Sequence, residues 1–230
     1  MLKISGEAMG GDSACGFDKA AIQMAAGEIR DVCVAGIELA VVVGAGNFVR
    51  GTESAALGIE RGTADYMGMT ATLLNALALQ SAVEALGYPT RVLTAIQADQ
   101  VAEPYIRRRA LRHMEKGRVV ILAGGTGNPY CTTDSAAALR SAELGCAAIL
   151  KATKVDGIYT ADPMKNPNAM RYDRIGYSQA IREELRVMDS TAFTMCRENR
   201  IPIIVYSMKI PGNTIKAATG QPVGTLVDGD

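Results

Sequence analysis

Short runs of consecutive apolar residues, many of them β-branched, alternate along the chain with longer segments of helical periodicity. The apolar runs lie at residues 40–43, 91–93, 119–123, 148–150, 201–206 and 225–227. Apolar residues that follow one another without polar alternation indicate strands buried on both faces, as in a parallel sheet covered by helices. The pattern therefore predicts a mainly parallel central sheet.

Four longer segments place apolar residues at helical spacing, at 18–35, 63–86, 133–144 and 189–199. Asp18 has the side chain of an N-cap, and Gly87 and Gly145 each follow a helical segment at a C-cap position. Strands and helices alternate, and no Pro- or Ser-rich linker interrupts them. We expect an α/β fold, a three-layer αβα sandwich, with residues 1–230 as a single domain of two lobes.

Composition narrows the classes of function. The chain has 24 Lys and Arg against 24 Asp and Glu, so its formal net charge is zero. A general binder of nucleic-acid backbones needs a basic surplus, so we expect no nucleic-acid partner. The only histidine, His113, argues against a His-rich metal site and against a His-based triad. It belongs to the one cluster of basic residues, 107–118, for which we expect a solvated or subunit-facing helix side.

The cysteines and the apolar stretches indicate in which cellular compartment the protein lies. The five cysteines include no C-x-x-C pair, which fits reduced thiols better than a disulfide framework. No signal-peptide pattern opens the chain, and no uninterrupted apolar stretch reaches the ~18 residues that span a bilayer. We expect a cytoplasmic protein with no membrane partner.

Two segments near predicted strands have the composition of anion sites. In an open α/β sheet, ligands bind beyond the carboxyl ends of the strands. Lys3 stands directly after the presumed edge of a first strand, and Ser5 and Gly6 follow it, so the segment can hold a polyphosphate. Residues 44–51 are rich in glycine, which lets backbone amides approach an anion, and Arg50 can clamp the same anion.

Two later segments offer directional hydrogen-bonding groups. Residues 124–134 supply backbone amides, an Asn amide and three Thr hydroxyls, a set that suits a polar heterocycle with a phosphate. Residues 151–163 add lysines to balance phosphate charge, Tyr159 to pack on a base and Asp162 to hold a sugar hydroxyl. Each segment alone also fits an ordinary turn or surface loop. The P-loop motif G-x-x-x-x-G-K-[ST] is missing, which excludes a P-loop kinase.

Taken in order, these segments resemble the amino acid kinase superfamily and, within it, the bacterial UMP kinase (uridylate kinase) family. The matching pieces are KISGEA at 3–8, VVVGAGNFVRG at 41–51, ADYMGM at 64–69, GTGNPYCTTDSAAALR at 125–140, KATKVDGIYTADP at 151–163 and PGN at 211–213. The resemblance implies transfer of the ATP γ-phosphoryl group to UMP, giving UDP and ADP. It also implies Mg²⁺ held mainly by ATP, with no dedicated protein metal site.

The resemblance carries residue roles onto matching positions. It implies catalytic roles for Lys3, Arg50 and Asp134, with Asp134 orienting Lys3. It implies ATP contacts from Lys3, Ser5, Gly6, Gly46, Arg50, Thr153, Tyr159 and Asp162. It implies UMP contacts from Ala45, Asp65, Thr126, Gly127, Asn128, Pro129, Tyr130, Cys131, Thr132 and Thr133. The N-terminal lobe would then hold UMP and the subunit contact, and the C-terminal lobe would hold the ATP site.

Regulation and assembly also follow from the resemblance alone. It implies a homohexamer, GTP as activator and UTP as inhibitor, with Gly11, Gly16, Arg91 and Arg118 at the GTP site. The segment between the two glycines departs from the family by Ala14 and Cys15.

Ala45 replaces a usual glycine, for which we expect weaker UMP binding at most. Either the start of the chain is trimmed, or the first strand is short and Lys3 is poorly anchored.

Two other functions stay open at this point. A related kinase could phosphorylate a carboxylate or a carbamate, although Asp65 and the 126–133 loop suit a nucleotide acceptor better. A non-catalytic nucleotide-binding relative is the other alternative, and the presence of Lys3, Asp134 and Asp162 argues against it.

Overall fold

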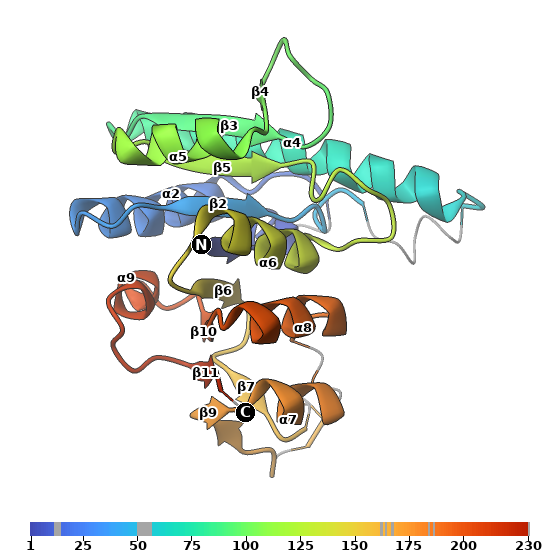
Figure 1. The fold of residues 1–230 in the computed structure, drawn as a ribbon, viewed down its shortest axis with the longest axis vertical. Helices are drawn as coiled ribbons and strands as arrows, with labels where there is room; N and C mark the ends of the chain where they lie inside the picture. The colour runs from blue at the N-terminus through green and yellow to red at the C-terminus, as the bar shows by residue number, and fades with distance from the viewer. Residues whose placement is uncertain are drawn as a thin grey trace.

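A computed structural model of the chain describes residues 1–11, 15–49, 57–161, 163, 165–166, 168–183, 185 and 187–229. Within these residues, nine strands form one sheet in the order β4-β3-β5-β2-β1-β6-β10-β11-β9 (Figure 1). The strands are β1 (Leu2–Ile4), β2 (Ala40–Val43), β3 (Thr90–Thr94), β4 (Glu103–Pro104), β5 (Val119–Ala123), β6 (Ile149–Thr153), β9 (Arg174–Ile175), β10 (Ile203–Ser207) and β11 (Thr225–Val227).

The sheet is mainly parallel, as the apolar runs predict. Every neighbouring pair runs parallel except β10 with β11. A separate antiparallel hairpin joins β7 (Ile158–Tyr159) to β8 (Arg171–Tyr172). The parallel order has one consequence for function, because the carboxyl ends of β1, β2, β5, β6 and β10 all meet at one edge of the sheet.

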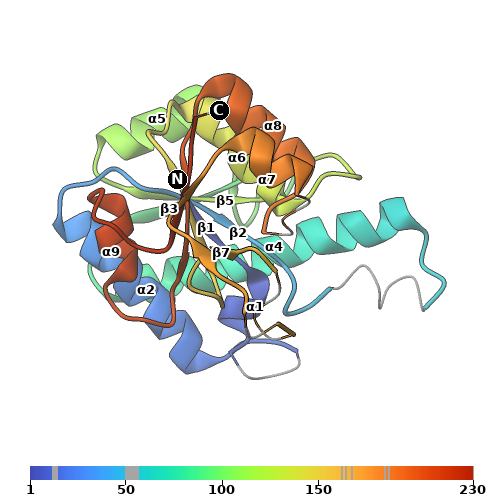
Figure 2. The same ribbon diagram turned by 90° about the horizontal axis from the view of Figure 1, so that it is seen from below.

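Helices cover both faces of the sheet, which Figure 2 shows nearly edge-on between two helical layers. One layer contains α1 (Gly6–Met9), α2 (Lys19–Val34), α4 (Arg61–Ala85) and α9 (Asn213–Ala218). The other contains α5 (Arg107–Glu115), α6 (Thr133–Leu144), α7 (Tyr177–Arg182) and α8 (Ser190–Asn199). The predicted three-layer αβα sandwich is therefore confirmed. The N-terminal part of α4 projects beyond the rest of the molecule (Figures 1 and 2).

The continuous apolar runs have a simple physical origin in this arrangement. In β2, Ala40 and Val42 pack into the core under α5, α6 and α8, while Val41 and Val43 pack into the core under α2 and α4. Side chains alternate between the two faces of a strand, so a strand covered on both sides must be apolar at every position.

The helix boundaries follow the capping signals. The Asp18 carboxylate accepts a hydrogen bond from the backbone N–H of Ala21, 2.7 Å away, and α2 begins one residue later. Helix α6 ends at Gly145, whose φ of 67° is left-handed. Among the described residues, no helix is both long and apolar enough to cross a membrane.

Candidate active site

The centre of the carboxyl edge holds two buried lysines around one carboxylate. Lys3 and Lys151 lie directly opposite each other on the paired strands β1 and β6. Asp134, in the first turn of α6, places one oxygen 2.9 Å from the Lys3 ammonium and the other 2.5 Å from the Lys151 ammonium. We call these three residues the Lys3–Asp134–Lys151 centre.

This geometry corrects the expectation for Lys3. The residue does not follow a strand at an edge but lies within β1, between β2 and β6 in the middle of the sheet. The strand is short, yet Lys3 is only 7% exposed and is held by Asp134, so it is firmly anchored. The role of Asp134 in orienting a lysine has a direct geometric basis, and it extends to Lys151.

Burial sets the electrostatics of the centre. Burial alone would raise the pKa of Asp134, but the charges of Lys3 and Lys151 outweigh that effect and hold the pKa below its usual value. Burial and then the charge of Lys3 lower the pKa of Lys151 to about 8, against the opposing pull of Asp134. The charge of Asp189 also raises the pKa of Lys151, so both ammonium groups are held by carboxylates in a poorly hydrated place, where they can receive an incoming anion.

A second carboxylate, that of Asp189, supports this centre. The sequence pattern predicts Asp189 only as the first residue of a helix. Asp189 caps α8 by accepting a hydrogen bond from Ala192 N–H at 2.8 Å. It also accepts hydrogen bonds from the hydroxyls of Thr132 and Ser135, both at the start of α6. Since Thr132 in turn caps α6, these bonds fix the helix end that carries Asp134.

The turn after β1 and the glycine loop after β2 (residues 44–49) are packed directly against each other. A Cβ on Gly6 would lie 2.4 Å from the backbone nitrogen of Gly46, and a Cβ on Gly44 would lie 2.8 Å from that of Gly6. These glycines are therefore required for close approach. Ser5 caps α1 by accepting a bond from Ala8 N–H.

Ala45 fits this loop without backbone strain. Among the described non-glycine residues, only Tyr130 and Arg200 have positive φ. Ala45 replaces a usual glycine, but its φ is not positive, so its Cβ imposes no left-handed strain on the loop.

Next to the glycine loop, a small pocket of about 140 Å³ gathers many of the residues expected around UMP. It is lined by Ala45, Val49, Ala64, Asp65, Gly68, Met69, Thr72, Gly125, Cys131, Thr132 and Thr133. Asp65 accepts a hydrogen bond from the backbone N–H of Tyr130 at 2.8 Å and forms an ion pair with Arg61. The carboxylate thus joins the start of α4 to the 124–133 loop.

The 124–133 loop owes its shape to its glycines and to α4. Gly124, Gly125 and Gly127 have φ values of 74°, 57° and 85°, a region that side chains disfavour. Gly124 N–H donates to the Thr72 hydroxyl at 2.8 Å. Thr126, in turn, lines a neighbouring pocket of about 370 Å³ with Arg140 and Tyr105.

Thr126 and Asn128 also bond to each other within the loop. Of the residues expected around UMP, the smaller pocket therefore gathers Ala45, Asp65, Cys131, Thr132 and Thr133, and the larger one contains Thr126.

The residues expected around ATP follow β6. Thr153 is its last residue, and its hydroxyl donates to the carbonyl of Val155 at 2.6 Å. Tyr159 lies in β7 and donates its hydroxyl to Asp156 at 2.7 Å. Lys154 forms an ion pair of 3.2 Å with Glu7 in α1, so this segment reaches the turn that follows β1. Arg50 and Asp162 lie outside the described residues.

The four residues expected at a GTP site divide between two places. Gly16 donates its N–H to the carbonyl of Asn47 in the glycine loop, and Gly11 packs against Asp18 at the start of α2. Arg91 and Arg118 instead lie at the beginnings of β3 and β5, the opposite edge of the sheet. Within one chain, therefore, the glycines and the arginines do not meet.

His113 is buried within the chain and does not belong to a solvated or subunit-facing helix side, contrary to the sequence-based expectation. It is only 9% exposed, and its Nε2 lies 3.2 Å from a Glu103 carboxylate oxygen. The Arg118 guanidinium lies 3.0 Å from its Nδ1. The side chain faces inward because β4 and its Glu103 pack beside α5, a tertiary contact that the basic pattern of the helix does not reveal.

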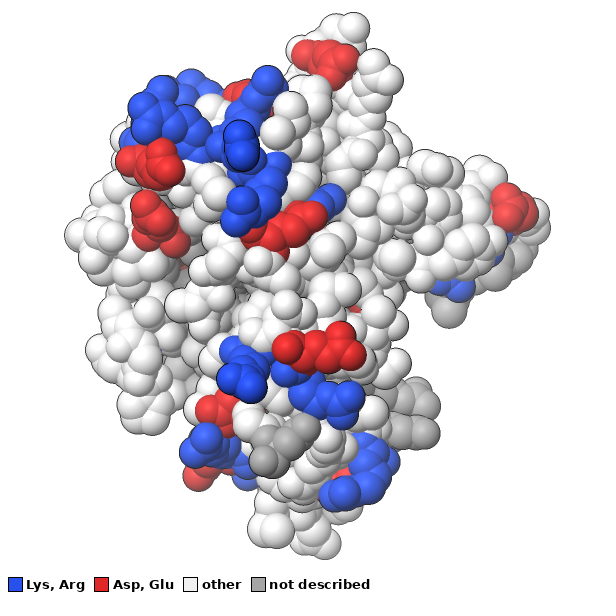
Figure 3. Space-filling view, in the orientation of Figure 1, with Lys and Arg blue, Asp and Glu red and all other residues white. Residues whose placement is uncertain are grey.

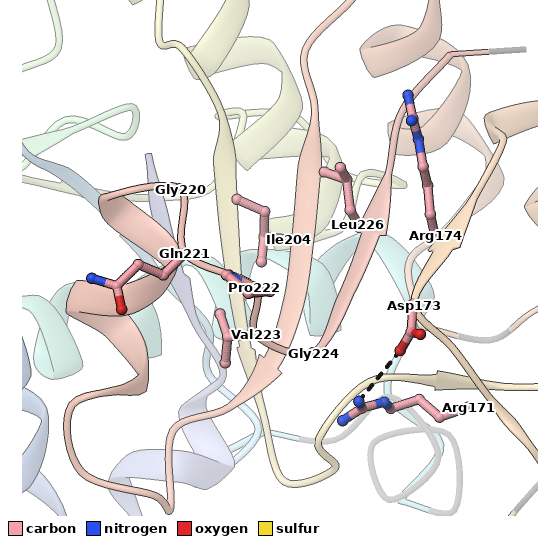
Figure 4. Close-up of a pocket in the computed structure, with 10 residues that line it drawn as sticks. All are labelled: Arg171, Asp173, Arg174, Ile204, Gly220, Gln221, Pro222, Val223, Gly224 and Leu226. Carbon is pink, nitrogen blue, oxygen red and sulfur yellow. Dashed lines mark hydrogen bonds and ion pairs between the residues drawn. The ribbon is translucent and has the colours of Figure 1, made fainter.

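A larger pocket of about 540 Å³ lies elsewhere, on the face of β10, β11 and β9 beside α9 (Figure 4). Apolar side chains of Ile204 and Leu226 form its floor, and Arg171 and Arg174 stand at its side. Both arginines are already paired with carboxylates, Arg171 with Asp156 and Arg174 with Asp228. None of the residues expected at the active site lines this pocket.

The fold and the site together define an α/β protein that handles phosphorylated ligands. The glycine loop and two buried lysines lie at the carboxyl edge of a parallel sheet, where positive charge favours phosphate. The chain belongs to the amino acid kinase family, whose model matches residues 1–207.

Three solved structures resemble the whole chain. UMP kinase from Bacillus anthracis is 36% identical, with a TM-score of 0.97, over 100% of this chain and 95% of that one. UMP kinase from Ureaplasma parvum is 36% identical, with a TM-score of 0.93, over 99% and 97%. Uridylate kinase from Archaeoglobus fulgidus is 29% identical, with a TM-score of 0.75, over 98% and 99%.

Proposed function

We propose that this chain is an ATP-dependent UMP kinase, which transfers the γ-phosphoryl group of ATP to UMP and releases UDP and ADP. The observation that carries the proposal is the Lys3–Asp134–Lys151 centre, in which two buried ammonium groups are held by one carboxylate at the carboxyl edge of the sheet. Full-length similarity to structures described as UMP and uridylate kinases supports the choice of acceptor.

The chemistry needs positioning and charge rather than a protein nucleophile. The attacking UMP phosphate is already anionic, so no protein base has to remove a proton from it. Transfer gathers negative oxygens from two nucleotides, and preorganised cations stabilise the charge that spreads over the transferring group. Lys3 and Lys151 supply two such cations, and Asp134 holds both ammonium groups toward the same point.

In this proposal the two nucleotides bind on different sides of the Lys3–Asp134–Lys151 centre. UMP would occupy the pocket of Ala45, Asp65 and the 126–133 loop, with its phosphate toward the glycine loop. ATP would lie over the turn after β1, contacting Ser5, Gly6 and Gly46, with its base near Thr153 and Tyr159. Arg50 and Asp162 would complete the two sites.

Magnesium belongs to this proposal as a companion of ATP. Among the described residues, no group of three His, Cys, Asp or Glu side chains comes together as a metal site. Asp134 faces two ammonium groups, so the centre offers a metal little free negative charge. Mg²⁺ would therefore be carried mainly by the phosphates of ATP and would neutralise part of their charge.

Assembly, regulation and location are the finer parts of the proposal. A homohexamer in the cytoplasm, with GTP as activator and UTP as inhibitor, is consistent with the family. Since Gly11 and Gly16 lie far from Arg91 and Arg118 along the sheet, a GTP site that used all four would need more than one chain. Otherwise GTP would bind only at Arg91 and Arg118.

The deciding experiment is a coupled assay of ADP formation with UMP, CMP, dCMP, aspartate and carbamate, each with and without GTP. We expect turnover with UMP and far less with the other acceptors. Turnover with aspartate or carbamate but not with UMP would overturn the choice of acceptor. Binding of UMP and ATP without UDP formation would indicate a non-catalytic relative, and an unchanged rate with GTP would remove the activator from the proposal.

A further inference from the structure

A pair of buried amides sits behind the glycine loop. Asn47, in that loop, is 3% exposed, and Asn75, in the middle of α4, is fully buried. Each side chain donates to the carbonyl oxygen of the other, at 3.0 Å from Asn47 and 2.8 Å from Asn75. Amides are costly to bury unless all their hydrogen bonds are made, so this pair calls for an explanation.

The remaining N–H groups of the pair reach two backbone segments of the site. Asn75 donates to the carbonyl of Gly44 at 2.7 Å, and Asn47 donates to the carbonyl of Gly16 at 2.9 Å. Gly16 N–H donates back to the Asn47 carbonyl at 2.8 Å. All four side-chain N–H groups are therefore used, and each of the two outward bonds ends on a main-chain carbonyl of a glycine.

The pair also lies against the turn that carries Ser5 and Gly6. A Cβ on Gly6 would stand 2.6 Å from the Asn47 side-chain oxygen, so that oxygen helps set the distance between the turn and the glycine loop. In addition, Gly44 N–H donates to the carbonyl of Ile4 at 2.8 Å. A displaced Asn47 would therefore disturb both segments that surround the phosphates.

Helix α4 presents a stripe of three polar residues to this region. Asp65, Thr72 and Asn75 are spaced by seven and three positions, which places them along one side of a helix. Asp65 holds Tyr130 N–H, Thr72 holds Gly124 N–H and Asn75 holds the Gly44 carbonyl. The helix therefore fixes the 124–133 loop at two points and the glycine loop at a third.

We propose that Asn47 and Asn75 form a positioning pair, which locks the glycine loop against α4 and so sets the place of the nucleotide phosphates relative to the Lys3–Asp134–Lys151 centre. The proposal rests on the proposed function, because it concerns the same reaction. The pair touches no reacting atom and acts through the main chain of Gly44 and Gly16. A fully satisfied buried amide network rigidifies and specifies one arrangement, which an apolar contact between the same elements would not do.

The test is Asn75→Asp, which keeps the shape but removes the amide donor. The ionised carboxylate would face two acceptor oxygens, of Gly44 and Asn47, and could donate to neither. At pH 8 we expect kcat/KM for UMP to fall about 100-fold, the scale of a small misplacement of reacting groups. Activity should rise as the pH is lowered, because burial raises the pKa of such a carboxyl and its protonated form donates again.

The controls separate positioning from stability. Asn199→Asp makes the same chemical change at an exposed position of α8 and should leave the pH profile as in the unaltered protein. A folded Asn75→Asp protein with unaltered kcat and KM at pH 8 would overturn the proposal. If that variant does not fold, Asn75→Ser replaces it, since it shortens the side chain without adding charge, and a lower kcat by about tenfold is expected.

A failure of the proposed function would give a different experimental result from a failure of the positioning pair. If the unaltered protein does not phosphorylate UMP, the acceptor is wrong, and the pair is judged by the rise in melting temperature that ATP produces. We then expect Asn75→Ser to reduce that rise and Asn199→Asp to preserve it. An equal rise in both variants would overturn the positioning role.

Discussion

Two charged clusters on the sheet have similar composition but different burial. At the carboxyl edge, the side chains of Lys3, Asp134 and Lys151 are 9%, 15% and 8% exposed. Beside the edge strand β4, in what we call the β4 cluster, those of Arg91, Glu103 and Arg109 are 38%, 34% and 43% exposed. In Figure 3 many basic side chains gather over α5 with acidic side chains beside them, whereas the carboxyl-edge lysines are buried.

The difference in burial changes what the same ion pairs can do. Exposed pairs are screened by water and each contributes only about 0–1 kcal/mol to stability. In the β4 cluster the arginines pair with exposed carboxylates, Arg91 with Glu84 and Glu103, and Arg109 with Glu103. At the carboxyl edge the ammonium groups of Lys3 and Lys151 are held by carboxylates out of water, where their charge acts on a ligand with little screening.

The largest effect is expected from Lys3→Ala, which removes one of the two buried cations. We expect kcat for UMP phosphorylation to fall by about a factor of 1000, the scale for loss of a group that stabilises charge in the transition state. Steady-state kinetics of ADP formation would measure it. Lys216→Ala, at an exposed position in the last turn of α9, is the matched control and should change kcat less than twofold. Near-normal turnover without Lys3 would contradict the central role of the buried cluster.

The next effect concerns Lys151 and pH. Its pKa of about 8 means that the ammonium form is lost as the pH rises through that value. We expect kcat/KM, which reports the free enzyme, to be highest below pH 8 and to fall above it. Lys151→Arg stays charged, so the fall near pH 8 should disappear, while Lys151→Met should lower kcat/KM about 100-fold below pH 8, with a smaller deficit above it. A decline near pH 8 that persists in Lys151→Arg would assign it to another group.

The fold was largely predictable because burial on both faces leaves a strong local signal. The run at 119–123 marks β5 residue by residue, and 133–144 marks α6 with its Gly145 cap. The strands β4, β7, β8 and β9 have two residues each, too few for any periodicity. They owe their place to pairing with distant segments, which no local pattern records.

The candidate site has a local sequence signal where polar residues follow a strand end, and it has none where tertiary register brings residues together. Lys151 reads locally as a charged residue near a loop, and only the pairing of β1 with β6 places it opposite Lys3. Asp189 reads as a helix cap, and its contact with Thr132 depends on how α8 packs beside α6. Asn75 reads as one polar residue in a long helix, although its spacing from Asp65 and Thr72 offered a signal.

The smallest effect is expected in the β4 cluster, where Arg109→Ala removes an exposed partner of Glu103. The pair is 3.6 Å apart and half-solvated, so we expect the free energy of unfolding to change by about 0.5 kcal/mol or less. We expect the UMP turnover to stay within twofold, because Glu103 lies in the edge strand β4, across the sheet from Lys3 in β1 with β3, β5 and β2 between them. Chemical denaturation and the ADP assay measure the two quantities. A fivefold change in turnover with unaltered stability would show that the β4 cluster acts on the centre through the sheet, and the two clusters would then form one functional unit rather than a site and a surface.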